Sequence, residues 1–81
     1  MSSVTVQLFA SYAESFGEQS LQIPLAEGST VRDLIDQLRG LRGSSWLPES
    51  PRIAVNRKFA TADQRIGPDD EVALIPPVAG G

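Results

Sequence analysis

The sequence predicts an α+β domain in which one main amphipathic helix covers one face of a mixed sheet of about five strands. Three patterns carry this prediction: an alternating apolar segment at residues 4–9, a helical apolar stripe at 31–41 and a second alternating segment at 71–75. The 81 residues leave room for one domain with a small core. A single main helix must therefore shield the buried face of the sheet.

The N-terminal part predicts two strands joined by a short helix. Residues 4–9 alternate and are rich in β-branched side chains. Residues 10–16 can form a short helix that Gly17 ends in a left-handed conformation. Residues 21–25 alternate again, and Pro24 indicates an edge position or a strand end because proline cannot donate to a strand ladder. The apolar residues that alternate along these two strands are Val4, Val6, Leu8, Leu21, Ile23 and Leu25.

The main helix is predicted to begin at residue 31. Thr30 is a suitable N-cap, and Asp33 three residues later gives an acidic variant of the capping box. Gly40 or Gly43 is expected to end the helix. The apolar stripe that follows the helical period consists of Val31, Leu34, Ile35, Leu38 and Leu41.

The C-terminal part predicts three further strands. Residues 52–56 form the first and residues 58–60 a shorter one, with a turn at Asn56-Arg57 between them. The Gly-Pro-Asp-Asp sequence at residues 67–70 predicts another turn, after which residues 71–75 form the last strand. The residues expected to point inward are Ile53, Val55, Val72 and Leu74.

This order of strand, strand, helix, strand, short strand and strand is that of the β-grasp, or ubiquitin-like, fold. The loop after the helix carries Trp46 and Leu47, which we expect to cap one end of the core. Pro76 and Pro77 end the last strand, because neither can donate to a ladder. We therefore expect a β-grasp domain over residues 1–75 and an extended tail over residues 76–81.

The composition excludes several kinds of chemistry. The chain has no Cys and no His, so disulfides, thiolate or imidazole metal sites, cysteine nucleophiles and Ser-His-Asp triads are excluded. Its net charge of −3 argues against nucleic-acid binding. Neither a secretory signal nor an apolar run near the ~20 residues of a membrane span is present, so we expect a cytoplasmic protein. The basic cluster of Arg52, Arg57 and Lys58 is best explained as a solvated surface.

The tail has a shape suited to entering the active site of another protein. Pro76 and Pro77 favour an extended conformation directed away from the sheet. Gly80 and Gly81 have no side chains, so the backbone can enter a narrow channel. A slim peptide of this kind can deliver its terminal carboxylate to a partner.

Several segments together resemble one known family. They are Val6-Gln7-Leu8-Phe9-Ala10 with Glu14 and Gly17, Gly28-Ser29-Thr30-Val31 with Leu34 and Leu38, Ala54-Val55-Asn56 and, most specific, Asp70-Glu71-Val72-Ala73-Leu74-Ile75-Pro76-Pro77-Val78-Ala79-Gly80-Gly81. The chain resembles the small, sulfur-carrying subunits of molybdopterin synthase, which belong to the ubiquitin-like sulfur carriers. The resemblance covers nearly the whole chain.

The resemblance implies a sulfur carrier that binds no cofactor and is not catalytic alone. In this family an ATP-dependent activating enzyme adenylates the terminal carboxylate, here that of Gly81. Sulfur then displaces AMP and leaves a thiocarboxylate. The tail enters the large subunit of the synthase, where the sulfur is transferred to a cyclic pterin precursor of molybdopterin.

The resemblance also implies where the partners bind. Alternation places Phe9 opposite Leu8, and Ile75 opposite Leu74, so both should lie on the uncovered face near the tail. The family binds its partners through an apolar patch at this place. The partner-binding residues expected beside the reacting Gly81 are Phe9, Ile75, Pro76, Pro77, Val78, Ala79 and Gly80.

Other functions remain open at this point. A carrier on the same fold could serve thiamine or cysteine synthesis, although the Pro-Pro-Val-Ala-Gly-Gly ending is closer to the molybdopterin branch. A ubiquitin-like modifier would attach Gly81 to lysines of target proteins. A simple interaction module would have an inert tail. The sequence also leaves open whether Phe59 belongs to the core or to the surface.

Overall fold

The computed structural model describes residues 2–41, 47–48 and 50–76. Its elements follow the predicted order: β1 (Ser2–Leu8), α1 (Ala10–Phe16), β2 (Ser20–Leu25), α2 (Val31–Arg39), β3 (Arg52–Val55), β4 (Lys58–Phe59) and β5 (Val72–Ile75). Several residues named in the sequence predictions lie outside the described ranges: Gly43, Trp46, Pro77, Val78, Ala79, Gly80 and Gly81.

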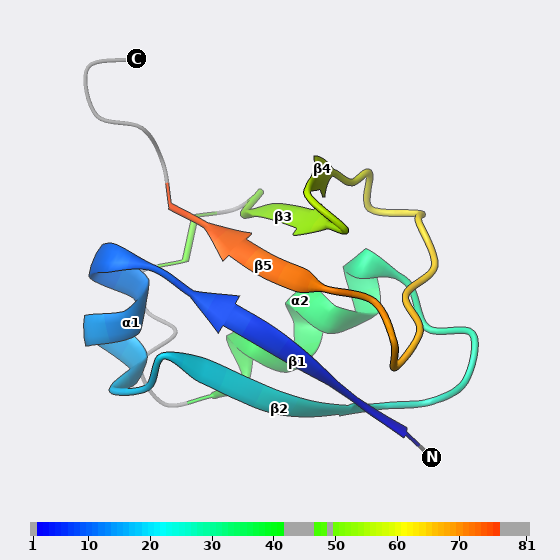
Figure 1. Ribbon diagram of the computed structural model, residues 1–81, viewed down its shortest axis with the longest axis horizontal. Coiled ribbons are helices and arrows are strands. Elements are labelled where there is room, and N and C mark those ends of the chain that lie inside the picture. Colours follow the sequence, from blue (N-terminus) through cyan, green and yellow to red (C-terminus); the bar gives the residue numbers. More distant parts are fainter. Residues whose placement is uncertain (1, 42–46, 49, 77–81) are drawn as a thin grey trace.

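The five strands form one mixed sheet in the order β2-β1-β5-β3-β4. β1 pairs antiparallel with β2 and parallel with β5, and β5 pairs antiparallel with β3 (Figure 1). Val6 of β1 therefore lies beside Val72 of β5 at the centre of the sheet. β2 forms one edge, which is one of the two positions that Pro24 indicated, and the two-residue β4 forms the other. The predicted β-grasp architecture is confirmed.

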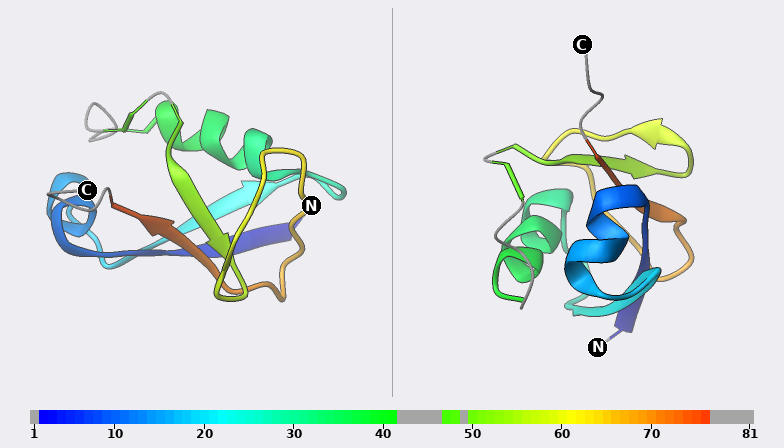
Figure 2. Two further views of the ribbon diagram at one scale, coloured as in Figure 1. Left: turned by 90° about the horizontal axis from the view of Figure 1, so that it is seen from above. Right: turned by 90° about the vertical axis from the view of Figure 1, so that its left-hand side faces the viewer.

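α2 covers one face of the sheet, and the side chains between them form the core (Figure 2). Val31, Leu34 and Leu38 of α2 are buried, as their helical spacing predicted. α1 lies at one end of the sheet, where its Tyr12 joins the core, and Leu47 belongs to the same cluster. The strands contribute the inner residues of their alternation: Val4, Val6, Leu8, Ile23, Leu25, Ile53, Val55, Val72 and Leu74.

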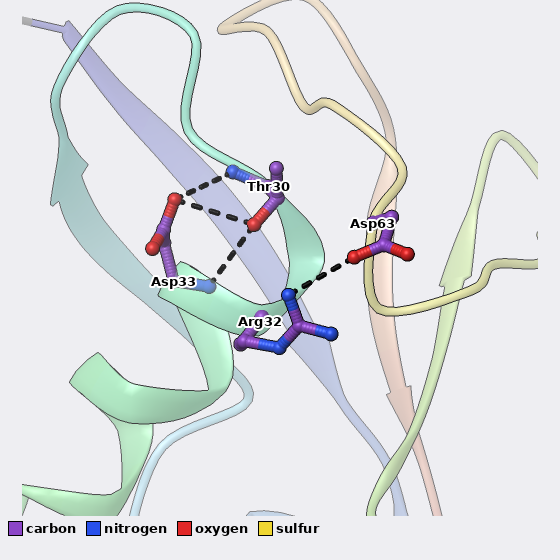
Figure 3. Close-up of polar contacts among 4 residues, drawn as sticks. All are labelled: Thr30, Arg32, Asp33 and Asp63. Carbon is purple, nitrogen blue, oxygen red and sulfur yellow. Dashed lines mark hydrogen bonds and ion pairs between the residues drawn. The ribbon is translucent and has the colours of Figure 1, made fainter.

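The predicted capping box fixes the start of α2. Asp33 N donates to Thr30 Oγ1 at 3.4 Å, and Thr30 N donates to Asp33 Oδ2 at 2.9 Å (Figure 3). The two bonds satisfy backbone donors that the first turn of a helix leaves unpaired. Beside them, Arg32 Nη1 lies 2.9 Å from Asp63 Oδ1, an exposed ion pair between the helix and the segment before β5.

The helix ends before its apolar stripe does. Gly40 is the C-cap, and its N–H donates to Gln37 O. Leu41 therefore lies beyond the helix and is 37% exposed, so its predicted place in the buried stripe is wrong. Ile35, on the flank of the stripe, is partly buried.

Candidate functional site

The face of the sheet turned away from α2 is polar where β1 and β2 form it. Ser3 Oγ donates to Gln22 Oε1 at 3.3 Å, and Gln22 Nε2 donates to Thr5 Oγ1 at 2.7 Å. Gln22 and Thr5 are direct cross-strand partners, so the three side chains form a ladder across the two strands. This half of the open face presents hydrogen-bonded polar groups to solvent.

The other half of the open face is apolar and hollowed. Side chains there line a hollow of about 390 Å³. Its apolar residues, which we term the open-face patch, are Phe9, Ala54, Phe59, Ala73 and Ile75. Arg57 and Glu71 form the charged rim of the patch. Phe9 is 50% exposed and Phe59 is 67% exposed, so two aromatic rings meet solvent at one place.

Strand pairing brings the predicted residues Phe9 and Ile75 together. β1 runs parallel to β5 with Leu8 opposite Leu74, so the next positions along the two strands are Phe9 and Ile75. Both lie on the face opposite the buried Leu8 and Leu74, where alternation predicted them. Pro76 follows Ile75 directly, and the patch therefore adjoins the point where the predicted tail begins.

The β3–β4 hairpin adds residues to the patch that the sequence left undecided or assigned to solvent. Phe59 pairs with Ala54 across the hairpin and lies with it on the open face. The guanidinium carbon of Arg52 lies 5.5 Å from the centroid of the Phe59 ring, a cation–π distance. Phe59 is thus a surface residue, and the Arg52 side chain lies beside the patch. Lys58 pairs with the buried Val55 and therefore points to the other side of the hairpin.

A hydrogen-bond network joins the β3–β4 turn to the start of β5. Asn56 N donates to Glu71 O at 2.7 Å, and Glu71 N donates to Asn56 Oδ1 at 2.9 Å. Asn56 Nδ2 donates to Asp70 Oδ1 at 3.0 Å, and Gly67 N donates to Asp70 Oδ2 at 2.7 Å. The bond from Gly67 N, and then the bond from Asn56, favour the ionised carboxylate and lower the pKa of Asp70.

The other described residues offer little further chemistry. Their His, Cys, Asp and Glu side chains form no group of three that could hold a metal ion. No helix within the described ranges is long and apolar enough to cross a membrane. Burial raises the pKa of Tyr12, whose hydroxyl has no hydrogen-bond partner among the described residues. Among the described residues, the open-face patch beside Pro76 is therefore the feature that we consider for a function.

Comparison with known proteins agrees with the resemblance found in the sequence. The profile of the ThiS family matches residues 6–81. A molybdopterin synthase sulfur carrier subunit of Dictyostelium discoideum is 40% identical over 82 residues, covering 94% of this chain and 93% of that protein. The predicted resemblance to molybdopterin synthase sulfur carriers is confirmed.

Two solved structures share the fold over nearly their whole length. One is a putative molybdopterin converting factor subunit 1 from Pyrococcus furiosus, with a TM-score of 0.81, 30% identity and coverage of 96% of this chain and 100% of that chain. The other is SAMP1, a small archaeal modifier protein of Haloferax volcanii, with a TM-score of 0.80, 28% identity and coverage of 98% and 99%. With its sequence matched over residues 6–81 and its fold shared with these two proteins, the chain belongs to the ThiS family.

Proposed function

We propose that this protein is the sulfur-carrier subunit of a molybdopterin synthase and acts in the cytoplasm. The observation that carries the proposal is the likeness to the Dictyostelium sulfur carrier subunit, which extends over 93% of that protein. The position of the open-face patch beside the root of the predicted tail supports it. A partner that covers the patch would hold the domain and aim the tail at the same time.

Gly81 supplies the reacting group in this proposal. Its carboxylate oxygen attacks the α-phosphate of ATP on an activating enzyme, which releases pyrophosphate and leaves a glycyl adenylate. A sulfur nucleophile then displaces AMP, so the terminal carbon carries sulfur in place of one oxygen. This chemistry uses the main chain, and it suits a sequence that contains no cysteine.

The large synthase subunit is the partner that uses the sulfur. The thiocarboxylate sulfur is transferred to a cyclic pterin precursor, and water supplies the oxygen that restores the Gly81 carboxylate. The two exposed aromatic rings of the patch provide the main affinity, because aromatic anchors dominate most protein interfaces. The residues that thread into the large subunit are Pro76, Pro77, Val78, Ala79 and Gly80.

Reconstitution of the activation step tests the proposal. The full-length chain, incubated with an activating enzyme, ATP and a sulfur donor, should gain the mass of an oxygen-to-sulfur exchange at Gly81. Mass spectrometry of the intact protein and of its C-terminal peptide measures this gain. Chains that lack Gly81, or carry one residue beyond it, should take up no sulfur and unfold at nearly the same temperature. Sulfur on another residue, or exchange without ATP, would contradict the proposal.

A second candidate function is that of a protein modifier, which the likeness to the Haloferax modifier favours. Both functions begin with adenylation of Gly81, but a modifier then forms an amide with a lysine amino group of a target. Peptide mass spectrometry of cells that express the tagged chain detects such amides. Lys58 is the only lysine of this chain, so self-conjugation would appear at that residue alone. Loss of molybdopterin on deletion of the gene, without lysine conjugates, would favour the carrier.

A further inference from the structure

The β3–β4 turn holds an arginine where the backbone favours glycine. Both residues of the turn have positive φ, 53° at Asn56 and 70° at Arg57. Two-residue hairpin turns with two positive φ angles prefer Asn followed by Gly, because most side chains are strained in this conformation. Asn56 fits the preference, whereas Arg57 does not.

The strained residue is held by its surroundings. Three hydrogen bonds tie Asn56 to Glu71 and Asp70, and the turn cannot shift without breaking them. The backbone of the next residue, Arg57, is therefore held in place in the turn, and its side chain lies at the rim of the patch. Backbone strain that persists under such constraint is concentrated at functional positions in proteins.

The Arg57 side chain is exposed to a partner. It is 87% exposed and lines the hollow of the patch. Its Nε lies 3.3 Å from Oε2 of Glu71, whose side chain is itself 56% exposed. An exposed ion pair of this kind contributes little to the free energy of folding. Arg57 can therefore leave Glu71 for a better partner with only a small loss of free energy. A carboxylate from another protein can bind the guanidinium in a two-point contact that the Nε contact with Glu71 does not provide.

The patch differs in charge from the chain as a whole. Arg52 at the Phe59 ring and Arg57 and Glu71 on the rim together give one net positive charge, whereas the chain carries −3. A protein surface with carboxylates around an apolar centre therefore complements this patch and would be repelled by the rest of the molecule. Such a charge difference selects the orientation in which the tail faces the partner.

We propose that Arg57 is a specificity-determining residue of the open-face patch, where it binds a carboxylate of the large synthase subunit. The inference rests on the proposed function, because it assumes that the large subunit covers the patch. Glycine would fit the turn better, and recognition of a partner explains why an arginine occupies it.

Three single variants test this role. Arg57→Gly removes the cation from the rim and relieves the turn. Glu71→Gln removes the internal competitor for Arg57 and retains the backbone bonds to Asn56. Lys58→Gln, the matched control, removes the same charge from the neighbouring residue on the other side of the hairpin. Association of each full-length variant with the large subunit from the same genome is measured at about 0.05 M and about 0.5 M salt, beside thermal melts.

We expect Arg57→Gly to associate about fivefold more slowly at low salt, with most of the difference lost at high salt. Its unfolding temperature should be unchanged or higher, because relief of the left-handed strain is partly offset by the freedom of glycine in the unfolded chain. Glu71→Gln should associate faster than the native chain, and Lys58→Gln should differ from it by less than about twofold. Slower binding of Arg57→Gly than of Lys58→Gln, without lower stability, identifies a local role of Arg57 in binding and excludes a folding defect or a general effect of net charge.

Unchanged association of Arg57→Gly would overturn the inference. Faster association of Arg57→Gly with slower association of Glu71→Gln would also overturn it, because that pattern indicates a basic partner surface. Phe9→Ala separates this outcome from failure of the proposed function. If Phe9→Ala weakens binding and Arg57→Gly does not, the proposed function stands and the role of Arg57 fails. If the large subunit does not bind the native chain, the proposed function itself fails.

Discussion

The two faces of the sheet use one alternating pattern for different purposes. On the face under α2, Val6, Val72 and Leu74 are fully shielded from solvent. On the opposite face, the neighbouring residues Ala73 and Ile75 belong to an uncovered patch. An apolar side chain under the helix contributes to the free energy of unfolding, whereas one on the open face is available for binding. Substitutions on the two faces should therefore separate stability from affinity.

The largest expected effect is on the covered face. Leu34 of α2 is fully buried in the core, so Leu34→Ala should lower the free energy of unfolding by about 2–5 kcal/mol through lost burial and the cavity left behind. Denaturant titration measures this loss. The fraction that remains folded should bind the large subunit normally. A decrease of less than about 0.5 kcal/mol in the free energy of unfolding would mean that Leu34 is not buried between α2 and the sheet.

The matching variants on the open face should affect binding instead. Phe9→Ala or Ile75→Ala should weaken binding to the large subunit about tenfold or more, close to 1.4 kcal/mol, because each removes an anchor at the root of the tail. Calorimetric titration measures the affinity, and thermal melts should show a much smaller change than for Leu34→Ala. Early melting with normal binding by the folded fraction would show that the two faces are assigned the wrong way round.

A smaller effect is expected at the turn that fixes the rim of the patch. The pKa of Asp70 lies below its ordinary value of 3.8, so its ionised form stabilises the fold above that pH. The contribution is lost as the pH falls from 3.8 through the lower pKa of the folded state. Asp70→Asn should therefore cost about 1 kcal/mol or less near neutral pH and flatten the decline of stability in acid. Thermal melts against pH measure this, with Asp69→Asn as the control; identical acid profiles for both variants would contradict the role of Asp70.

The smallest effect is expected on the polar half of the open face. Gln22→Ala removes the exposed bonds to Ser3 and Thr5, and it should change the free energy of unfolding by about 0.5 kcal/mol or less. Binding to the large subunit should be unchanged, since the variant lies outside the patch. A loss of affinity comparable to that of Phe9→Ala would extend the binding surface over the whole open face.

The sequence predicted the covered face well, because the residues buried between the helix and the sheet are apolar residues at regular helical and strand spacings. Thr30 and Asp33 correctly predicted the start of α2, and the apolar stripe up to Leu38 correctly predicted its buried side. Leu41 was misplaced because the stripe continued past Gly40, and spacing alone does not decide which of two glycines ends a helix. Phe9 and Ile75 were placed correctly relative to their buried neighbours, although alternation says nothing of which strands are adjacent.

Two features of the site were not predicted from the sequence, for physical reasons. Phe59 follows a turn, and its exposure depends on whether another element covers the hairpin, which is a tertiary property. Arg57, Arg52 and Lys58 were interpreted together from the sequence as a solvated basic surface. The sequence alone does not show which of these side chains the turn places on the open face of the sheet. The offset of Phe59 from the turn, with Ala54 as its partner across the hairpin, was the signal that could have placed it.

The parallel contact between β1 and β5 affects how the protein is made. β5 leaves the ribosome after every other strand, yet it lies between β1 and β3 at the centre of the sheet. Before residue 72 is synthesised, the N-terminal hairpin and the β3–β4 hairpin have no strand to join them. The loop that separates Val6 from Val72 must close late, so the domain completes its sheet only after almost all of it has been translated. Chains whose translation stops before β5 cannot complete the sheet and remain accessible to proteases. Every folded molecule has therefore been translated at least as far as the strand that precedes the tail.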